Sequence, residues 1–176
     1  MPLRLIDPEP QQHEFRDDDM HEIRPRLFVG NLHAAYNVTR LSQCGIQTVL
    51  TCEPHAEAPL DAEQDPTSPP FLHRRIGLAD QPHPSFSAQA SFAQGCDIIS
   101  EALQQDSGAI LVHCFGGQNR SVSLICAYLM LGEGWDVSKA MEFIKAKHPL
   151  AEPNAFYMNE LEKWAQERSK AAVAKE

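Results

Sequence analysis

Residues 109–131 read AILVHCFGGQNRSVSLICAYLML, and in this order they predict a strand, a tight loop and a helix. Residues 109–112 form a short apolar run of the kind that is buried on both faces of a parallel sheet. Residues 121–131 are apolar on nearly every side, as is typical of a helix in the centre of a domain. Between them, Gly116 and Gly117 allow a tight backbone curl in which successive N–H groups point inward. The pattern indicates a loop that binds an anion.

The same loop holds groups that can act on a bound phosphate. Arg120 has a planar guanidinium group that matches two phosphate oxygens, and the first amides of the following helix add positive potential. Cys114 stands at the start of the loop, where helix N-termini and cationic neighbours favour a nucleophilic thiolate. A buried, inert cysteine in an ordinary strand–helix turn is the alternative. The combination of Cys114, five residues, Arg120 and Ser121 favours a phosphocysteine-forming site.

The remaining chain alternates between strand and helix patterns. Strands are expected at 27–30, 47–51 and 71–78, and helices at 31–43, around 92–103, from 137 and from about 154. Strands that alternate with helices predict an α/β fold with a central, mostly parallel, twisted sheet flanked by helices.

The domain organisation follows from the same patterns. Residues 1–20 are polar and acidic and are expected to form a flexible arm. Residues 21–168 are expected to form one catalytic domain, and residues 169–176 a charged tail. Residues 53–70 hold five prolines without periodicity, which predicts a loop.

Composition and charge narrow the classes of function. A chain of 176 residues supports one domain with a substantial core. The net charge of −9 opposes a nucleic-acid partner, and no apolar run approaches the roughly 18 residues of a membrane span. The five cysteines are odd in number, lack metal-ligand spacing and fall mostly in apolar stretches. These features favour a reducing compartment, and we expect a cytoplasmic protein, with entry into the nucleus left open. We also expect a monomer without a cofactor, and no metal, because Arg120, the loop amides and the helix dipole can neutralise a phosphate.

The loop from His113 to Ser121, HCFGGQNRS, resembles the active-site loop of the dual-specificity branch of the cysteine-based protein tyrosine phosphatases. Three further stretches match that family in the same order. They are residues 24–31, similar to its opening strand, Leu78-Ala79-Asp80, similar to its general-acid loop, and Pro153-Asn154, similar to the start of its last helix. The resemblance covers about residues 21–168. It implies an enzyme that removes phosphate from phosphorylated proteins.

The resemblance also implies roles for the residues of the loop. Cys114 is the nucleophile, Arg120 binds phosphate, and the hydroxyl of Ser121 stabilises the leaving thiolate, with an ordinary helix N-cap as the alternative. His113 is similar to a family histidine that hydrogen-bonds around the cysteine, with a buried structural histidine as the alternative. The phosphate-binding residues are expected to be Phe115, Gly116, Gly117, Gln118, Asn119 and Arg120.

The reaction also needs a general acid, because an expelled alkoxide is a very poor leaving group without a proton. Asp80 is the best candidate, since it follows the strand at 71–78 and precedes a proline-rich turn. Asp61 and Asp65 compete from within the irregular acidic loop, and a turn or cap aspartate is the alternative for Asp80. Asn154 resembles a family asparagine near the active site, with a helix cap as the alternative.

Three functions remain open for this site. By resemblance, so short a chain lacks the added loop of tyrosine-specific relatives, and a shallow pocket admits phosphotyrosine, phosphoserine and phosphothreonine alike. Asn119 stands where the family often has serine and is similar to the RNA 5′-triphosphatases, although the negative charge and Asp80 oppose that function. Gly116 stands where the family often has alanine. A module that binds phosphorylated partners without turnover is the third function, opposed by the presence of Cys114 and Arg120.

Cys52 ends the strand expected at 47–51. By resemblance to phosphoinositide phosphatases that carry a cysteine after the corresponding strand, Cys52 is a candidate redox partner of Cys114. A buried, inert thiol at a strand end is the alternative.

Overall fold

The structure is a computed structural model that describes residues 19–53, 71–81, 86–104 and 108–173, with side chains up to residue 168. Its centre is a five-stranded sheet in the order β1-β2-β5-β3-β4. β1 pairs with β2 in the antiparallel direction, whereas β2, β5, β3 and β4 run parallel. The expected α/β fold with a mostly parallel sheet is confirmed. The strands are β1 (Met20–Arg24), β2 (Leu27–Gly30), β3 (Ile46–Glu53), β4 (Leu72–Gly77) and β5 (Ala109–His113).

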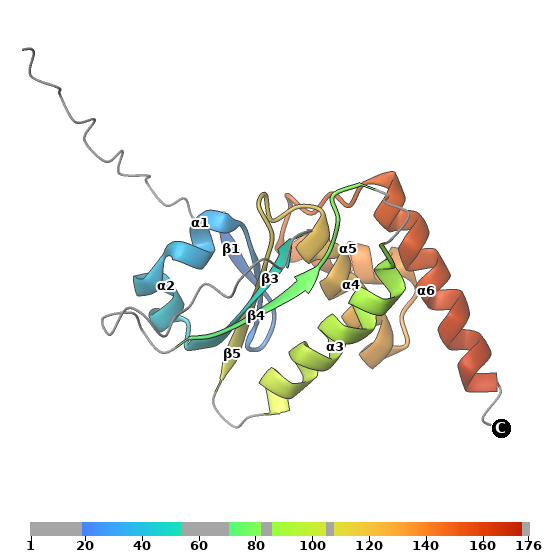
Figure 1. Ribbon diagram of the computed structural model, residues 1–176, viewed down its shortest axis with the longest axis horizontal. Coiled ribbons are helices and arrows are strands. Elements are labelled where there is room, and N and C mark those ends of the chain that lie inside the picture. The colour runs from blue at the N-terminus through green and yellow to red at the C-terminus, as the bar shows by residue number, and fades with distance from the viewer. Residues whose placement is uncertain (1–18, 54–70, 82–85, 105–107, 174–176) are drawn as a thin grey trace, which may run out of the picture.

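Helices cover both faces of the sheet (Figure 1). Side chains alternate across β5, so Leu111 faces one buried cluster while Ile110 and Val112 face another. The smaller cluster lies under α1 (Leu32–Tyr36) and α2 (Val38–Gln43). The larger cluster lies under the four remaining helices, α3 (Ala88–Gln104), α4 (Arg120–Glu133), α5 (Val137–Lys147) and α6 (Ala155–Val173).

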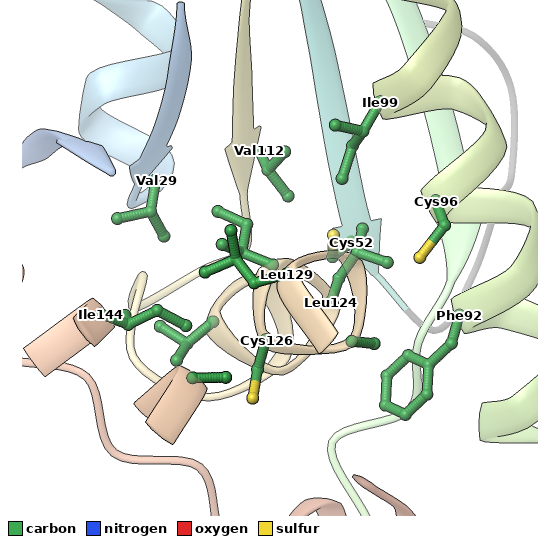
Figure 2. Close-up of a cluster of buried hydrophobic side chains, with 14 of the residues drawn as sticks. Val29, Cys52, Phe92, Cys96, Ile99, Val112, Leu124, Cys126, Leu129 and Ile144 are labelled. Carbon is green, nitrogen blue, oxygen red and sulfur yellow. The ribbon is translucent and has the colours of Figure 1, made fainter. Parts of the chain in front are cut away.

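Helix α4 is the centre of the larger core, which explains why its sequence is apolar on nearly every side. In Figure 2, Val112 lies on the sheet over α4, Phe92 lies on α3 to one side and Ile144 on α5 to the other. Gly95 of α3 lets the two helices approach closely, because a Cβ atom there would lie 2.5 Å from Cδ1 of Leu124. Helix α4 is thereby packed into the core from its second turn onward, directly after the loop that precedes it.

Three elements differ from the sequence prediction. The helix expected at 31–43 is two helices, because Asn37 ends α1 and its Oδ1 accepts the N–H of Arg40 at 3.1 Å to begin α2. β1 was not predicted and begins at Met20, within the expected arm. Helix α6 continues to Val173, past the expected start of the tail. The loop expected at 53–70 lies outside the described residues except for Glu53, as do residues 1–18 of the arm.

Candidate active site

The carboxyl ends of the parallel strands meet at one edge of the sheet, where ligands of open α/β folds bind. The register of β3 and β5 pairs Thr51 with His113, so these strands end side by side. Residues 114–120, called the Cys114 loop below, leave this edge and lead into α4. Glu53 ends β3 and Asp80 follows β4 by three residues, so both are brought to the same edge.

The backbone of the Cys114 loop is held from outside. The carbonyl of Phe115 accepts the N–H of Leu32 at 3.1 Å, and the carbonyl of Gln118 accepts the N–H of Glu152 at 2.9 Å. Because each peptide unit is planar and trans, an outward carbonyl turns the following N–H inward. The loop therefore presents N–H groups toward its centre, which is the geometry that binds anions.

Gly117 makes the turn of the loop. Its φ is +69°, and a Cβ atom there would lie 2.8 Å from the carbonyl carbon and oxygen of Gly30. The N–H of Gly117 donates to Sγ of Cys114 at 3.3 Å. Gly116 has no positive φ, and a Cβ atom there would meet nothing within 4 Å. The curl therefore requires glycine only at Gly117, in agreement with the alanine that the family often has where Gly116 stands.

Cys114 is buried at the base of the loop, with 2% of its surface exposed. Its Sγ lies 3.3 Å from Oγ of Ser121, which is fully buried. Asn119 occupies the N-cap position of α4, so Ser121 is not the N-cap. The N–H of Gly117 and the hydroxyl of Ser121 together provide two donors for negative charge on the sulfur.

Arg120 is a buried cation between two carboxylates. Its Nη1 lies 2.7 Å from Oε2 of Glu53, and its Nε lies 3.4 Å from Oδ1 of Asp80. Burial alone would lower the pKa of Arg120, but the nearby Glu53, Cys114 and Asp80 outweigh it and raise the pKa. The guanidinium thus keeps its charge next to the thiol. Sequence reasoning missed Glu53, although a carboxylate at the end of a buried strand is a signal for this edge.

Asp80 lies on the solvent side of the same arginine. Its side chain is 66% exposed, and its Oδ1 accepts the Nδ2–H of Asn119 at 3.4 Å. A carboxyl group that is open to solvent and next to an arginine at the mouth of an anion-binding loop can exchange protons with a bound group and with water. Asp61 and Asp65, the competing candidates, lie outside the described residues.

The start of α6 holds the segment that carries Asp80. The hydroxyl of Tyr157 donates to the carbonyl of Ala79 at 2.7 Å, and Nδ2 of Asn154 donates to the carbonyl of Asp80 at 3.2 Å. Burial is the main cause that raises the pKa of Tyr157, so its hydroxyl keeps this proton. Oδ1 of Asn154 accepts the N–H of Tyr157 at 3.0 Å, while its own N–H donates to Oδ1 of Asn119 at 2.9 Å. Asn154 is therefore both a helix cap and a contact of the site.

The chain matches the family model described as dual specificity phosphatase, catalytic domain, over residues 27–167. It belongs to this family. Dual specificity protein phosphatase 1 of Arabidopsis thaliana is 32% identical over 149 residues, which cover 84% of this chain and 70% of that protein. Dual specificity protein phosphatase 1B of the same plant is 33% identical over 146 residues, covering 83% of this chain and 81% of that protein.

The fold comparison agrees with the sequence comparison. The crystal structure of a mouse putative dual specificity phosphatase complexed with zinc tungstate is similar with a TM-score of 0.75 and 26% identity, covering 91% of this chain and 94% of that one. The resemblance predicted from HCFGGQNRS is confirmed, and the chain is a protein phosphatase of the cysteine-based type.

In this phosphatase His113 is buried and neutral. It is 3% exposed, and its Nε2 lies 2.9 Å from Oγ1 of Thr51. Burial is the main cause that lowers the pKa of His113 to about 4, and an interaction with the backbone of Cys114 offsets it only in part. His113 therefore brings no positive charge to the thiol at neutral pH. Its contact with Thr51 links the end of β5 to β3, as expected of a buried structural histidine.

Cys52 is next to Cys114 in the core of the phosphatase. Thr51 pairs with His113, so Cys52 and Cys114, which directly follow them, are neighbours where β3 and β5 end. Both cysteines belong to the same buried cluster, in which Figure 2 labels Cys52. Burial is the first cause that raises the pKa of the Cys52 thiol well above its usual value, and Cys114 adds to it. The position of Cys52 suits a redox partner of Cys114, whereas its protonated thiol disfavours rapid attack on an oxidised Cys114.

Two histidines that the sequence did not single out hold a third carbonyl of the Cys114 loop. Nε2 of His148 lies 2.8 Å from the carbonyl oxygen of Gly117. Nδ1 of the same ring lies 2.7 Å from Nδ1 of His21, which comes from β1. From the sequence alone His148 is an ordinary residue at the end of a helix, so nothing pointed to this contact.

Proposed function

We propose that this phosphatase hydrolyses phosphotyrosine, phosphoserine and phosphothreonine in proteins through a phosphocysteine intermediate on Cys114. The observation that carries the proposal is the position of Sγ of Cys114, which lies 3.3 Å from the nitrogen of Gly117 and 3.3 Å from Oγ of Ser121. This sulfur sits in a loop whose outward carbonyls turn its N–H groups inward. The arrangement suits a thiolate that attacks a phosphate bound in the loop.

The two steps of the reaction assign work to each residue. The thiolate of Cys114 attacks phosphorus and the bond to the leaving oxygen breaks, while Asp80 gives that oxygen its proton. Arg120 and the inward N–H groups neutralise the remaining phosphate oxygens. Water then attacks the phosphocysteine, Asp80 takes a proton from it, and the hydroxyl of Ser121 stabilises the departing thiolate.

The surroundings of the site support a phosphoprotein substrate. Phe115 is 69% exposed beside the thiol and offers an apolar contact to a polypeptide. The loop contains no lysine, and Glu53 and Asp80 lie against its arginine. Carboxylates at this place repel polyanions such as inositol phosphates and RNA 5′-triphosphates. Asn119 has a local use here, since it contacts Asp80 and Asn154, and an RNA substrate is not needed to explain it.

The oligomeric state and the cellular location of the protein are proposed from its helices, its charge and its cysteines. Within the described part of the chain, no helix combines the length and the apolar character that crossing a membrane requires. With a net charge of −9 and five cysteines without disulfide partners among the described residues, we propose a cytoplasmic monomer without nucleic-acid or membrane partners.

Matched substrates test the proposed specificity. We expect p-nitrophenyl phosphate and three peptides of one sequence, phosphorylated on tyrosine, serine or threonine, to be hydrolysed without added metal. An RNA 5′-triphosphate is expected to be inert. Hydrolysis of the RNA with inert peptides would replace this proposal by the triphosphatase function. Binding of the peptides without turnover would replace it by the binding module.

Asp80→Asn is expected to slow aryl phosphates with basic leaving groups by about 10²-fold, within the range of general acid catalysis. Aryl phosphates with acidic leaving groups should be slowed far less, because their oxygen leaves without a proton. The measurement is kcat/KM for a series of aryl phosphates whose leaving groups differ in basicity.

Asp97→Asn serves as the control for Asp80, since Asp97 is an exposed aspartate on α3. It should leave the dependence on leaving group unchanged. An equal loss for all leaving groups in Asp80→Asn would show that Asp80 acts only by shaping the loop.

We also propose that Cys52 captures the oxidised nucleophile. Peroxide converts the thiolate of Cys114 into a sulfenic acid, and the Cys52 thiol then condenses with it, forming a disulfide and releasing water. Because the pKa of Cys52 is raised, this capture should be slow and should compete with further oxidation. After brief peroxide treatment, dithiothreitol is expected to restore activity in the parent several-fold better than in Cys52→Ser.

Cys96→Ser is the control, because Cys96 is another buried thiol, on α3, whose pKa is raised to about 12. It should recover like the parent. Peptide mapping by mass spectrometry should find a Cys52–Cys114 link. Full recovery of Cys52→Ser, with no such link, would leave Cys52 as an inert core residue.

A further inference from the structure

His148 touches the outer side of the Cys114 loop from the C-cap of α5, and only 1% of its surface is exposed. Its Nε2 lies 2.8 Å from the carbonyl oxygen of Gly117. A carbonyl group can only accept, so Nε2 carries the proton and donates. The ring thus has a fixed donor that points at one peptide unit of the loop.

That peptide unit is the one after the turn of the loop. Gly117 has a φ of +69° and directs its own N–H to Sγ of Cys114 at 3.3 Å. Its carbonyl points the other way, to His148, and the planar peptide then directs the N–H of Gln118 inward. The hydrogen bond from His148 therefore sets the orientation of an N–H group that faces the bound phosphate.

His21 sets the orientation of the His148 ring. The two Nδ1 atoms are 2.7 Å apart, and the ring centroids are 4.9 Å apart. One proton lies between the two nitrogens, so one of them donates and the other accepts. His21 stands on β1, and this contact ties the first strand of the sheet to the end of α5. A chain of hydrogen bonds thus runs from β1 to the loop that holds the nucleophile.

We propose that His148 is a positioning residue of this phosphatase, and that it holds the Gly117 carbonyl outward so that the Cys114 loop presents its N–H groups to the phosphate. His21 supports it by fixing the ring. The proposal rests on the proposed phosphocysteine mechanism, because the aligned N–H groups act on the phosphate that Cys114 attacks. Without the donor, the peptide after Gly117 is free to rotate, and its carbonyl can turn toward the phosphate oxygens.

Three substitutions separate the donor from the bulk of the ring. Gln places an amide nitrogen close to the position of Nε2, Asn places one close to Nδ1, and Phe keeps the ring without a donor. His148→Phe and His148→Asn are expected to lower kcat/KM for p-nitrophenyl phosphate about tenfold, somewhat less than the loss of a direct oxyanion donor. Inhibition by vanadate should weaken by a similar factor. His148→Gln should recover most of both losses.

A substitution at Ile144, on the same helix, serves as the control for a general loss of stability. Ile144→Val removes one methyl group from the buried face of α5 and leaves the His148 ring in place. Its kcat and its vanadate inhibition should equal those of the parent even if its Tm falls. His21→Leu should repeat the effect of His148→Phe in weaker form, about threefold, while His21→Asn, which keeps a polar atom near Nδ1, should lose less.

Binding of inorganic phosphate tests the positioning without turnover. In a Cys114→Ser background, His148→Phe is expected to weaken binding of inorganic phosphate about tenfold, measured by calorimetry. If the parent fails to hydrolyse phosphates yet this difference appears, the proposed mechanism is wrong and the positioning role stands. If phosphate binding and vanadate inhibition do not change in His148→Phe, or if Gln is no better than Asn, His148 has only a structural role.

Discussion

Cys114→Ser is expected to reduce turnover of p-nitrophenyl phosphate to below about one per cent of the parent, a loss of more than ~2.7 kcal/mol of transition-state stabilisation. A serine hydroxyl is a much weaker nucleophile than a cysteine sulfur, so the proposed attack on phosphorus should fail in this variant. Binding should survive, because Arg120 and the inward N–H groups of the loop are unchanged. The measurement is steady-state hydrolysis together with capture of phosphorylated proteins by the variant.

Cys44→Ser is the matched control, since Cys44 is a half-buried thiol at the end of α2, outside the site. It should retain the activity of the parent. Activity above one per cent in Cys114→Ser would point to a different nucleophile. Loss of phosphate binding in the same variant would show instead that the sulfur itself helps to hold the ligand.

The site residues that the sequence singled out are mostly consecutive, so a single motif was enough to propose them. The Cys114 loop lies between an apolar strand and an apolar helix, and both patterns are visible in a short window. Asp80 could be placed for a related reason: it follows a strand, and the ends of parallel strands meet at one edge. Its contact with Arg120 at 3.4 Å agrees with that reasoning.

The contacts that the sequence did not predict join residues far apart in the chain. Glu53 is 67 residues from Arg120, and His21 is 127 residues from His148. Glu53 follows the candidate Cys52 at the end of a strand, which is a weak signal, whereas no neighbour of His21 in the sequence marks it as part of a site. The His21 contact also depends on β1, which carries no regular alternation of buried and exposed residues and has the burial order buried, half-buried, exposed, buried, half-buried.

The turn between β1 and β2 explains why this hairpin was overlooked. It is formed by Pro25 and Arg26, and Arg26 has a φ of +69°. Two-residue hairpins usually place glycine or asparagine at such a φ. Here the backbone N–H of Arg26 donates to Oε1 of Glu22 at 2.9 Å, and its guanidinium donates to the carbonyl of Leu103 at 2.7 Å. Tertiary contacts thus stabilise a turn that local preferences disfavour.

Arg120→Lys is expected to lower kcat/KM about 10²–10³-fold, nearly as far as Arg120→Ala, since the loss matches that of a donor to a developing oxyanion. The guanidinium holds Glu53 through Nη1 and lies next to Asp80 through Nε. It therefore has separate nitrogens for its carboxylate partner and for a phosphate. Lysine has one nitrogen on a flexible stem and cannot make both sets of contacts in this geometry. The measurement is kcat/KM for p-nitrophenyl phosphate together with inhibition by vanadate.

The activity of Arg120→Lys shows whether the site needs only a positive charge at this position or also the geometry of the guanidinium group. Glu53 lies 2.7 Å from Nη1 of Arg120, and a lysine ammonium that pairs with this carboxylate is drawn away from the phosphate. Arg74→Lys is the control, because Arg74 is a half-buried arginine of β4 that pairs with Glu101 at 3.8 Å, and it should retain the parent activity. Activity of Arg120→Lys within about threefold of the parent would mean that positive charge alone suffices. In that case the pairing with Glu53 would serve to stabilise the fold, and Glu53→Gln should lower Tm without lowering kcat.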